Sequence, residues 1–248
     1  MEALCEAAVL TGIEEIGISE HFDSHPDDEC TGFFQVDEWW KEFERCKREY
    51  QGVLTLKAGL ELSEPHQYPQ EVNEILDAHP WDYTIGSLHW IGDRIIFKDP
   101  YFEQSPQEAY EKYFVELHRM VELGRFNILG HMDIVKRRGF EHYGDFHVKE
   151  YEKFIRPVLR TLVRRDLALE VNTITLRRSI QEPSPNFQVL SWFKEEGGRW
   201  ISLGSDAHEA ADVGANLKDA MRLITAAGFK DVVSYNSGRP TSIEISER

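Results

Sequence analysis

Six side chains in this sequence form a candidate set of ligands for divalent metal ions. The set contains imidazoles and carboxylates but no thiolate: His21, Glu61, His89, His131, Asp206 and His208. Such ligands suit zinc, manganese or iron(II), and a carboxylate can bridge two ions. Asp206 and His208 are separated by one residue, so both would face the same side of an extended segment. Metals clustered at a phosphate group polarise its oxygens and acidify water, which is the chemistry of phosphate-ester hydrolysis.

Basic residues lie shortly after two of the predicted strand ends. Lys136 and Arg137 come soon after Asp133, and Arg177 comes soon after Thr173. In a chain of net charge −16, cations in these places are candidates for binding phosphate, the guanidinium groups through paired hydrogen bonds. A solvated basic turn that pairs with nearby acids is the alternative.

The remaining histidines and the cysteines are not expected to bind metal. Five histidines lie in predicted helices or polar loops, where surface histidines are common: His66, His79, His118, His142 and His147. His25 is less clear, because its loop leaves the strand end at His21. The cysteines form no C-x-x-C pair, which argues against a disulfide framework and a thiolate zinc site; they are Cys5, Cys30 and Cys46.

The candidate ligands fall where predicted strands end. Short apolar runs alternate with amphipathic helical segments, which favours an α/β protein with a mainly parallel sheet. Strands are expected at 16–19, 53–61, 83–89, 127–130, 168–171, 200–203, 232–235 and 241–245. Helices are expected at 2–10, 36–50, 68–78, 106–123, 148–165, 186–196 and 214–227. In a (β/α) barrel the carboxyl ends of the strands form one rim where catalytic residues lie, so we expect one convergent site.

Length and charge limit the class of protein. No linker or repeat divides residues 1–248, and (β/α) barrels reach this length as one unit, so a single domain is expected. The chain has 44 acidic and 28 basic residues, and this excess of negative charge disfavours nucleic acids and anionic membranes as partners. Neither a membrane span nor a signal peptide is expected. We therefore expect a soluble, cytoplasmic protein whose partner is a small phosphorylated substrate.

Several motifs resemble those of the polymerase-and-histidinol-phosphatase (PHP) superfamily, in particular its histidinol-phosphate phosphatases of histidine biosynthesis. They occur in the family's order over almost the whole chain: IGISEHF (16–22), AGLE (58–61), IGSLHW (85–90), GHMD (130–133), EVNT (170–173) with Leu176-Arg177 after it, and SLGSDAH (202–208). The resemblance implies a distorted (β/α)7 TIM-like barrel with up to three divalent metal ions at its rim.

The resemblance also implies a role for each candidate ligand. Glu61 would bridge two ions, and His89 with His131 would complete one of them. Asp206 would belong to the other bridged ion. His21 and His208 would serve the third ion.

One family feature is not found in the printed sequence. The family opens with a strand that carries H-x-H and a further histidine, just before the helix matched by residues 2–10. Without it, three expected ligands and the first barrel strand are missing, fewer ions would be bound, and neighbouring strands would have exposed edges. A misplaced start site or a truncated chain is the preferred explanation, and a natural variant with a reduced metal site is the alternative. Exposed edges also suggest a homodimer.

The activity implied by the resemblance is hydrolysis of a phosphate monoester, L-histidinol phosphate. Activated water would attack phosphorus in line while the metals and Arg177 neutralise the oxygens, and Asp206 or His208 would pass a proton to the leaving alkoxide. Glu20 or Glu64 is expected to pair with the substrate's ammonium group. The alternatives are a phosphatase for phosphotyrosine, a nucleotide or a sugar phosphate, and a non-catalytic metal- or phosphate-binding module. A nuclease is disfavoured by the charge and the lack of a basic groove.

Overall fold

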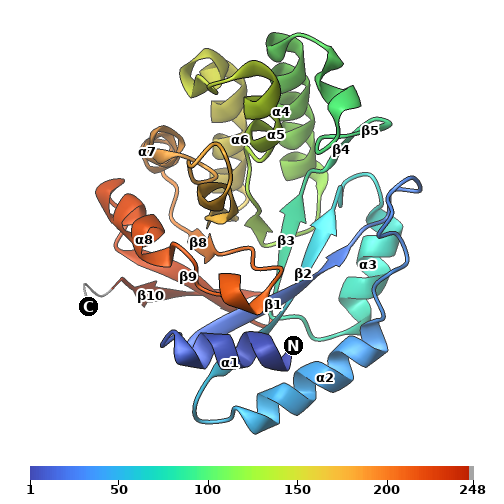
Figure 1. Ribbon diagram of the computed structural model, residues 1–248, viewed down its shortest axis with the longest axis vertical. Coiled ribbons are helices and arrows are strands. Elements are labelled where there is room, and N and C mark those ends of the chain that lie inside the picture. Colours follow the sequence, from blue (N-terminus) through green and yellow to red (C-terminus); the bar gives the residue numbers. More distant parts are fainter. Residues whose placement is uncertain (246–248) are drawn as a thin grey trace.

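The computed structural model describes residues 1–245, and its centre is a curled parallel sheet (Figure 1). Six strands pair in the order β1-β2-β3-β6-β7-β8. Their bounds are β1 Glu15–Phe22, β2 Thr55–Ser63, β3 Tyr83–Ser87, β6 Ile128–Leu129, β7 Ala168–Asn172 and β8 Ile201–Gly204. Every pairing within this sheet is parallel. The carboxyl ends of the six strands therefore lie along one edge, as the alternating sequence pattern predicts.

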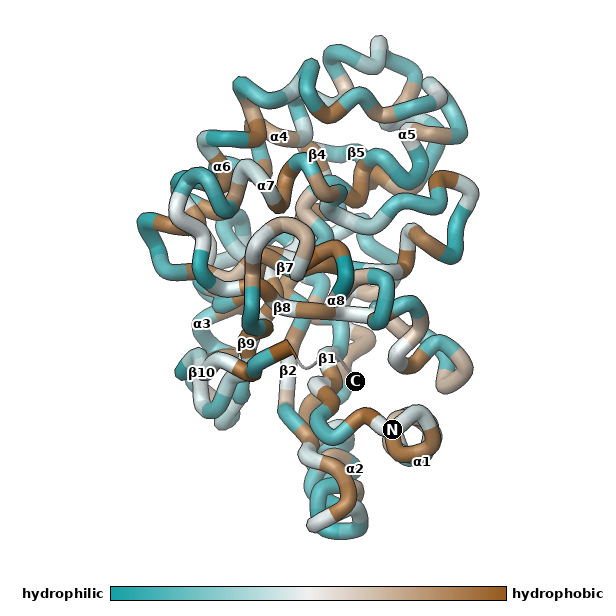
Figure 2. Tube along the Cα trace, turned by 90° about the vertical axis from the view of Figure 1, so that its left-hand side faces the viewer, coloured by the Kyte–Doolittle hydropathy of each residue, from teal (hydrophilic) through white to brown (hydrophobic). Residues whose placement is uncertain are grey.

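Helices connect the strands and surround the sheet (Figure 1). They are α1 Glu2–Leu10, α2 Val36–Glu49, α3 Pro69–Ala78, α4 Pro106–Leu123, α5 Val135–Tyr143, α6 Glu152–Arg164, α7 Phe187–Glu195 and α8 Leu217–Ala226. In α6 an apolar stripe at helical spacing is buried, including Ile155, Leu159 and Leu162. Hydrophobic segments occur both in the strands and along the helices, including α1, whereas many peripheral turns are hydrophilic (Figure 2). No helix in the part described is long and apolar enough to cross a membrane.

Two antiparallel hairpins lie outside the parallel sheet. One is formed by β4 Trp90–Ile91 and β5 Arg94–Ile95, and the other by β9 Asp231–Asn236 and β10 Arg239–Glu244. The sequence pattern predicts the last two strands but not their pairing as a hairpin. The two strands pair because a two-residue turn at Ser237 and Gly238 joins them. Both residues have positive φ (49° and 76°), a conformation whose twist suits a tight hairpin.

The interior of the curl contains aromatic and aliphatic side chains from several strands. The ring of Tyr83 lies across the backbone of Gly17 and Gly59, where an added Cβ atom would overlap it. Tyr83 belongs to a small buried cluster with Ile128 and Trp200. A cavity of about 480 Å³ extends from this interior to the carboxyl edge. In residues 1–245 no strand joins β1 to β8, so the sheet is curled and open between these two strands.

Candidate metal centre

Glu61 lies among three histidines at the carboxyl edge of the sheet. Its Oε1 atom is 3.0 Å from His131 Nε2 and 3.5 Å from His89 Nε2, and its Oε2 atom is 3.8 Å from His21 Nε2. His21 and Glu61 are direct neighbours in the register of β1 and β2. His89 and His131 follow β3 and β6, the next two strands of the sheet. The topology thus brings four of the six predicted ligands together.

The spacing of these donor atoms fits a divalent metal. Nitrogen and oxygen ligands at about 2.1 Å from a tetrahedral ion are roughly 3.4 Å from one another. The separations between Glu61 and the three imidazoles, 3.0–3.8 Å, agree with that figure. Ligand atoms of His21, Glu61 and His89 also lie within 4.8 Å of one another. The donor set contains only imidazole and carboxylate, as zinc, manganese and iron(II) accept.

The electrostatics of this group favour positive charge beside Glu61. Burial opposes ionisation of Glu61, but the His21, His131 and His89 rings outweigh it and hold its pKa well below the usual range. Burial lowers the pKa of His131, yet the contact with Glu61 raises it overall to about 9. Glu61 likewise raises the pKa of His21. A position that stabilises extra positive charge on imidazoles is also suited to a cation.

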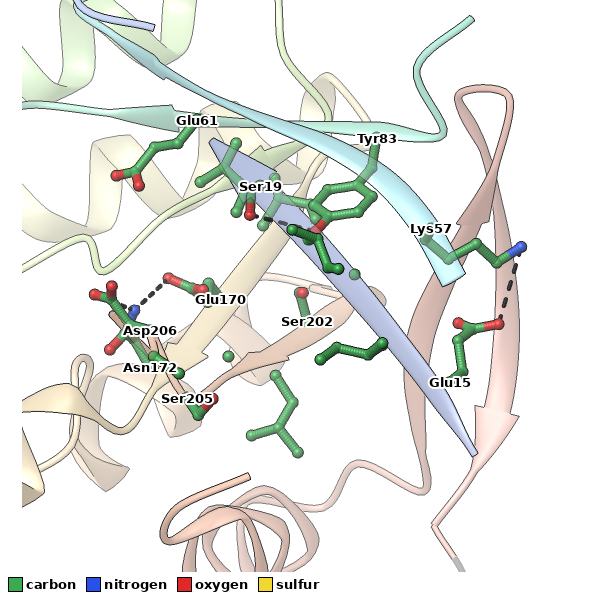
Figure 3. A pocket seen from close by; sticks show the side chains of 18 of the residues that line it. Glu15, Ser19, Lys57, Glu61, Tyr83, Glu170, Asn172, Ser202, Ser205 and Asp206 are labelled. Atoms are coloured by element: carbon green, nitrogen blue, oxygen red, sulfur yellow. Dashed lines mark hydrogen bonds and ion pairs between the residues drawn. The ribbon is translucent and has the colours of Figure 1, made fainter. Parts of the chain in front are cut away.

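Asp206 is tied to this centre by a buried hydrogen-bond network. Asn172 Nδ2 donates to Asp206 Oδ2 and to Glu170 Oε2, both at 3.1 Å. Glu170 Oε2 also accepts a hydrogen bond from the backbone N–H of His131 at 2.8 Å. Burial raises the pKa of Glu170 to about 7. Figure 3 shows Glu61, Glu170, Asn172 and Asp206 around one side of the same cavity.

His208 completes the set at the exposed side. Its Nδ1 atom is 3.4 Å from Asp206 Oδ1, its side chain is 63% exposed, and its ring centroid is 6.0 Å from that of His21. The expected extended segment is wrong, because Asp206 has a φ of 51° and lies in a loop after β8. The loop conformation, rather than strand alternation, brings Asp206 and His208 together.

A second layer of polar side chains lies behind the histidines. These side chains are not among the residues that the sequence predicts for the metal centre. Ser63 Oγ donates to Asp23 Oδ1 and lies 3.0 Å from His89 Nδ1. Glu64 accepts hydrogen bonds from the backbone N–H groups of His89 and Trp90. Asp23 and Ser63 each lie two residues after a predicted ligand, so strand alternation could have indicated them.

The expected role of Glu64 at the mouth of the site needs correction. Glu64 has no exposed surface, and burial raises its pKa to about 7, so it is not placed to meet an ammonium group in solvent. Glu20 is half-buried, and its Oε1 accepts a hydrogen bond from the His21 backbone N–H at 3.4 Å. Glu64 is instead a structural support for the backbone at His89.

The PHP domain model matches residues 1–174 of this chain. This protein belongs to the PHP domain family. The histidinol-phosphatase of Lactococcus lactis is 30% identical over 238 residues, which cover 92% of this chain and 86% of that protein. The probable histidinol-phosphatase of Clostridium acetobutylicum is 27% identical, with 87% and 83% covered. The resemblance inferred from the motifs is therefore confirmed.

Solved structures agree with this assignment to the PHP family. The crystal structure of histidinol phosphate phosphatase from Lactococcus lactis, complexed with zinc, L-histidinol and phosphate, matches with a TM-score of 0.86 and 27% identity. The match covers 96% of this PHP protein and 91% of that chain. The crystal structure of the putative histidinol phosphatase from Listeria monocytogenes matches with a TM-score of 0.78 at 20% identity, which supports the fold.

The three predicted phosphate-binding cations occupy different environments in this PHP protein. Arg137 is half-buried over the Phe97 ring at 5.8 Å, and Phe97 packs against His89 with ring centroids 5.2 Å apart. Within residues 1–245, Arg137 has no ion pair. Burial and the nearby Arg178 lower the pKa of Arg137. Arg137 is thus a cation beside the candidate ligands that has no carboxylate partner in the described part of the chain.

Arg177 and Lys136 are engaged within the protein. Arg177 Nη2 donates to the Ser205 carbonyl at 2.7 Å, and its Nε lies 3.4 Å from Asp212. Lys136 is completely buried, with Nζ 2.9 Å from Asp133 Oδ2 and 3.0 Å from Glu182 Oε2. Its Nζ also donates to the Pro183 carbonyl at 2.7 Å. Two hydrogen bonds and the ion pair with Asp133 thus hold this buried ammonium group within the protein.

The side chains of two other histidines are buried rather than exposed at the surface. His66 was expected at the surface, but its side chain is 1% exposed and its Nε2 lies 2.7 Å from Glu116. The His25 ring stacks on Trp90 at 3.9 Å between centroids, and its Nε2 lies 3.2 Å from the Gly92 carbonyl. His25 therefore supports the loop after β1 and does not join the imidazoles around Glu61.

Proposed function

We propose that this protein hydrolyses L-histidinol phosphate to L-histidinol and inorganic phosphate with the help of bound divalent metal ions. The observation that carries the proposal is the Glu61 carboxylate surrounded by the Nε2 atoms of three histidines at the carboxyl edge of a PHP sheet. The similar Lactococcus lactis enzyme was crystallised with zinc, L-histidinol and phosphate. That complex supports both the class of metal and the substrate.

The proposed metal ligands are the six residues identified above. Glu61 would bridge two ions, His89 and His131 would complete one of them, Asp206 would belong to the other, and His21 and His208 would hold a third. Bound divalent ions would neutralise charge on the phosphoryl oxygens and activate the attacking water. Zinc is the first candidate, with manganese and iron(II) as alternatives, because all three accept imidazole and carboxylate ligands.

The protein's own side chains supply binding and proton transfer in this proposal. Arg137 and Arg177 bind the phosphate oxygens, Arg137 with a guanidinium that has no ion-pair partner in the described chain and Arg177 after releasing Asp212. Asp206 or His208, which lie next to each other at the exposed side of the site, passes a proton to the leaving alkoxide when that side chain is not bound to a metal ion.

We also propose that the sheet closes into a (β/α)7 barrel when an extended segment pairs with both β1 and β8. These strands end the sheet order, and each has one side without a partner strand in residues 1–245. Ile16 and Ile18 of β1 and Leu203 of β8 line the cavity between them. Closure would bury this apolar surface. If these edges instead paired with those of a second copy of the chain, the result would be the expected homodimer.

The test of the proposed activity is phosphate release from L-histidinol phosphate with zinc and manganese in separate reactions. Turnover that is lost in Glu61→Gln would support the proposal. Turnover of phosphotyrosine peptides or sugar phosphates, with none of L-histidinol phosphate, would contradict the proposed substrate. Zinc binding without turnover of any ester, also in a chain extended with the codons upstream of Met1, would favour a binding module.

A further inference from the structure

We propose that Asp23 is a shared positioning residue for two of the candidate metal ligands. It acts on His21 directly and on His89 through the hydroxyl group of Ser63. This inference rests on the proposed function, because it assumes that His21 and His89, on either side of Glu61, are ligands of the bound metal ions. The carboxylate would orient both imidazoles and, through Ser63, select which nitrogen of the His89 ring faces the metal.

Counting hydrogens sets the direction of the hydrogen bonds from His89 to Asp23. The Asp23 carboxylate has no hydrogen, so Ser63 Oγ must donate its only hydrogen to Asp23 Oδ1. The contact of 3.0 Å between Ser63 Oγ and His89 Nδ1 then requires the ring nitrogen to donate. His89 Nδ1 therefore carries a hydrogen. Its Nε2, 3.5 Å from Glu61 Oε1, is left with the lone pair that a metal needs.

His21 is arranged around the same carboxylate in a parallel way. Its Nδ1 is 3.8 Å from Asp23 Oδ2, and its Nε2 is 3.8 Å from Glu61 Oε2. Both rings thus direct Nδ1 toward Asp23 and Nε2 toward Glu61. One oxygen of Asp23 serves each ring, through Ser63 in the case of His89.

The sheet register explains why these residues meet. His21 pairs with Glu61 in the parallel register of β1 and β2, and Asp23 and Ser63 each follow two residues later. Alternation along a strand places residues two apart on the same face. Asp23 and Ser63 therefore form the layer next to the ligands, where they are 9% and 1% exposed.

The burial of Asp23 indicates that its negative charge has a role beside the candidate metal ligands. A buried carboxylate is costly unless it is paired and hydrogen-bonded. In residues 1–245, no Lys or Arg forms an ion pair with Asp23. The basic group within ion-pair distance is the His21 ring, whose Nδ1 lies 3.8 Å from Asp23 Oδ2. Cations held by His21 and by His89 would supply the missing positive charge one layer away. Carboxylates behind ligating histidines fix the tautomer and raise the basicity of the ligand.

Zinc affinity, measured by competition with a chromophoric chelator, tests the energetic part. Asp23→Asn and Ser63→Ala should each weaken zinc binding by roughly 10- to 100-fold. If Asp23 reaches His89 only through Ser63, the double variant should lose less than the product of the two single losses. Ser184→Ala is the matched control, because Ser184 is a buried serine that donates to a carboxylate, Asp133, with no histidine attached. It should bind zinc as the unchanged protein does.

A spectroscopic measurement on the unchanged protein tests the tautomer and does not depend on a variant folding. In the zinc-loaded protein, nitrogen-15 NMR should show a hydrogen on Nδ1 of His89. Ser63→Ala should shift that Nδ1–H signal and leave His131 unchanged, because His131 Nδ1 has no hydrogen-bond partner in the described chain. A hydrogen-free Nδ1 on His89 would overturn the inference.

The failures of the two proposals are distinguishable. If the unchanged protein binds no zinc, the metal centre is wrong and the role of Asp23 falls with it. If it binds zinc but both variants bind as tightly as Ser184→Ala, the metal centre stands and only the positioning role is overturned. If the loss of zinc affinity in the double variant equals the product of the two single losses, Ser63 is not the link between Asp23 and His89.

Discussion

Glu61 Oε1 and His131 Nε2 lie 3.0 Å apart although 70 positions separate the two residues in the chain. Glu61 is near the end of β2 and His131 follows β6, with β3 between these strands in the sheet. The contact therefore reports the parallel arrangement of the strands. It also joins a largely buried carboxylate, 13% exposed, to an imidazole whose pKa is raised to about 9.

Replacement of Glu61 by alanine should remove two metal ions together. A bridging carboxylate contributes to both sites, so its loss weakens both. Elemental analysis of zinc-equilibrated protein measures the change. Glu116→Ala is the control, since Glu116 lies 2.7 Å from the buried His66, which is not one of the candidate ligands. Loss of one ion or none in Glu61→Ala would argue against bridging.

The metal-free protein should lose stability as pH rises from about 5 to 9. The folded-state pKa of His131 is about 9 against an ordinary 6.5, so its contribution is complete below pH 6.5 and lost as pH passes 9. For Glu170 the pKa is raised to about 7 from 4.5, so ionisation costs stability between those values. Glu61 has the opposite sign, but its contribution is lost only at acid pH, below its ordinary value.

Thermal unfolding with excess chelator at three pH values measures this trend. The shift of His131 alone corresponds to on the order of 3 kcal/mol across its range. The zinc-loaded protein should depend less on pH over the same interval, because the metal takes the place of the ligand protons. A midpoint that is constant or increases toward pH 9 without metal would contradict the assigned shifts.

Lys136→Met should destabilise the protein by about 3–5 kcal/mol, because it leaves the buried Asp133 carboxylate without its cation. Both side chains of this pair are completely buried. The added change Asp133→Asn should recover part of the loss. Chemical denaturation measures these differences. Lys98→Met is the control, since the Lys98–Glu29 pair is largely exposed, and it should leave the unfolding midpoint unchanged.

Arg137→Ala should raise KM for L-histidinol phosphate by roughly 10- to 100-fold, the loss expected for a charged hydrogen bond. Steady-state kinetics at saturating zinc measures it. The neighbouring Arg138 pairs with Asp99 and Glu141, so Arg138→Ala serves as the matched control and should leave KM unchanged. Equal KM values in the two variants would remove Arg137 from the phosphate site.

Sequence pattern alone predicted the strands of the parallel sheet and, to within three residues, where their carboxyl ends lie. It missed the short strands β4 and β5. The apolar runs before His21, Glu61 and His131 have the composition of buried strands, and alternation with helices predicts a parallel sheet. Because all carboxyl ends of such a sheet share one edge, the convergence of the ligands follows from local pattern. Helix α5 was missed, since its nine residues include few apolar side chains and a glycine, a weak helix former.

Only the tertiary structure decided what each polar side chain contacts. Lys136 and Arg137 are adjacent in sequence, yet Lys136 forms a buried ion pair and Arg137 lies half-buried near the candidate ligands. The hydrogen bond between Ser63 and Asp23 spans 40 positions, and no local pattern encodes such a partner. Burial and hydrogen bonding depend on the packing of distant segments. Periodicity in the chain records only which face of its own helix or strand a residue occupies.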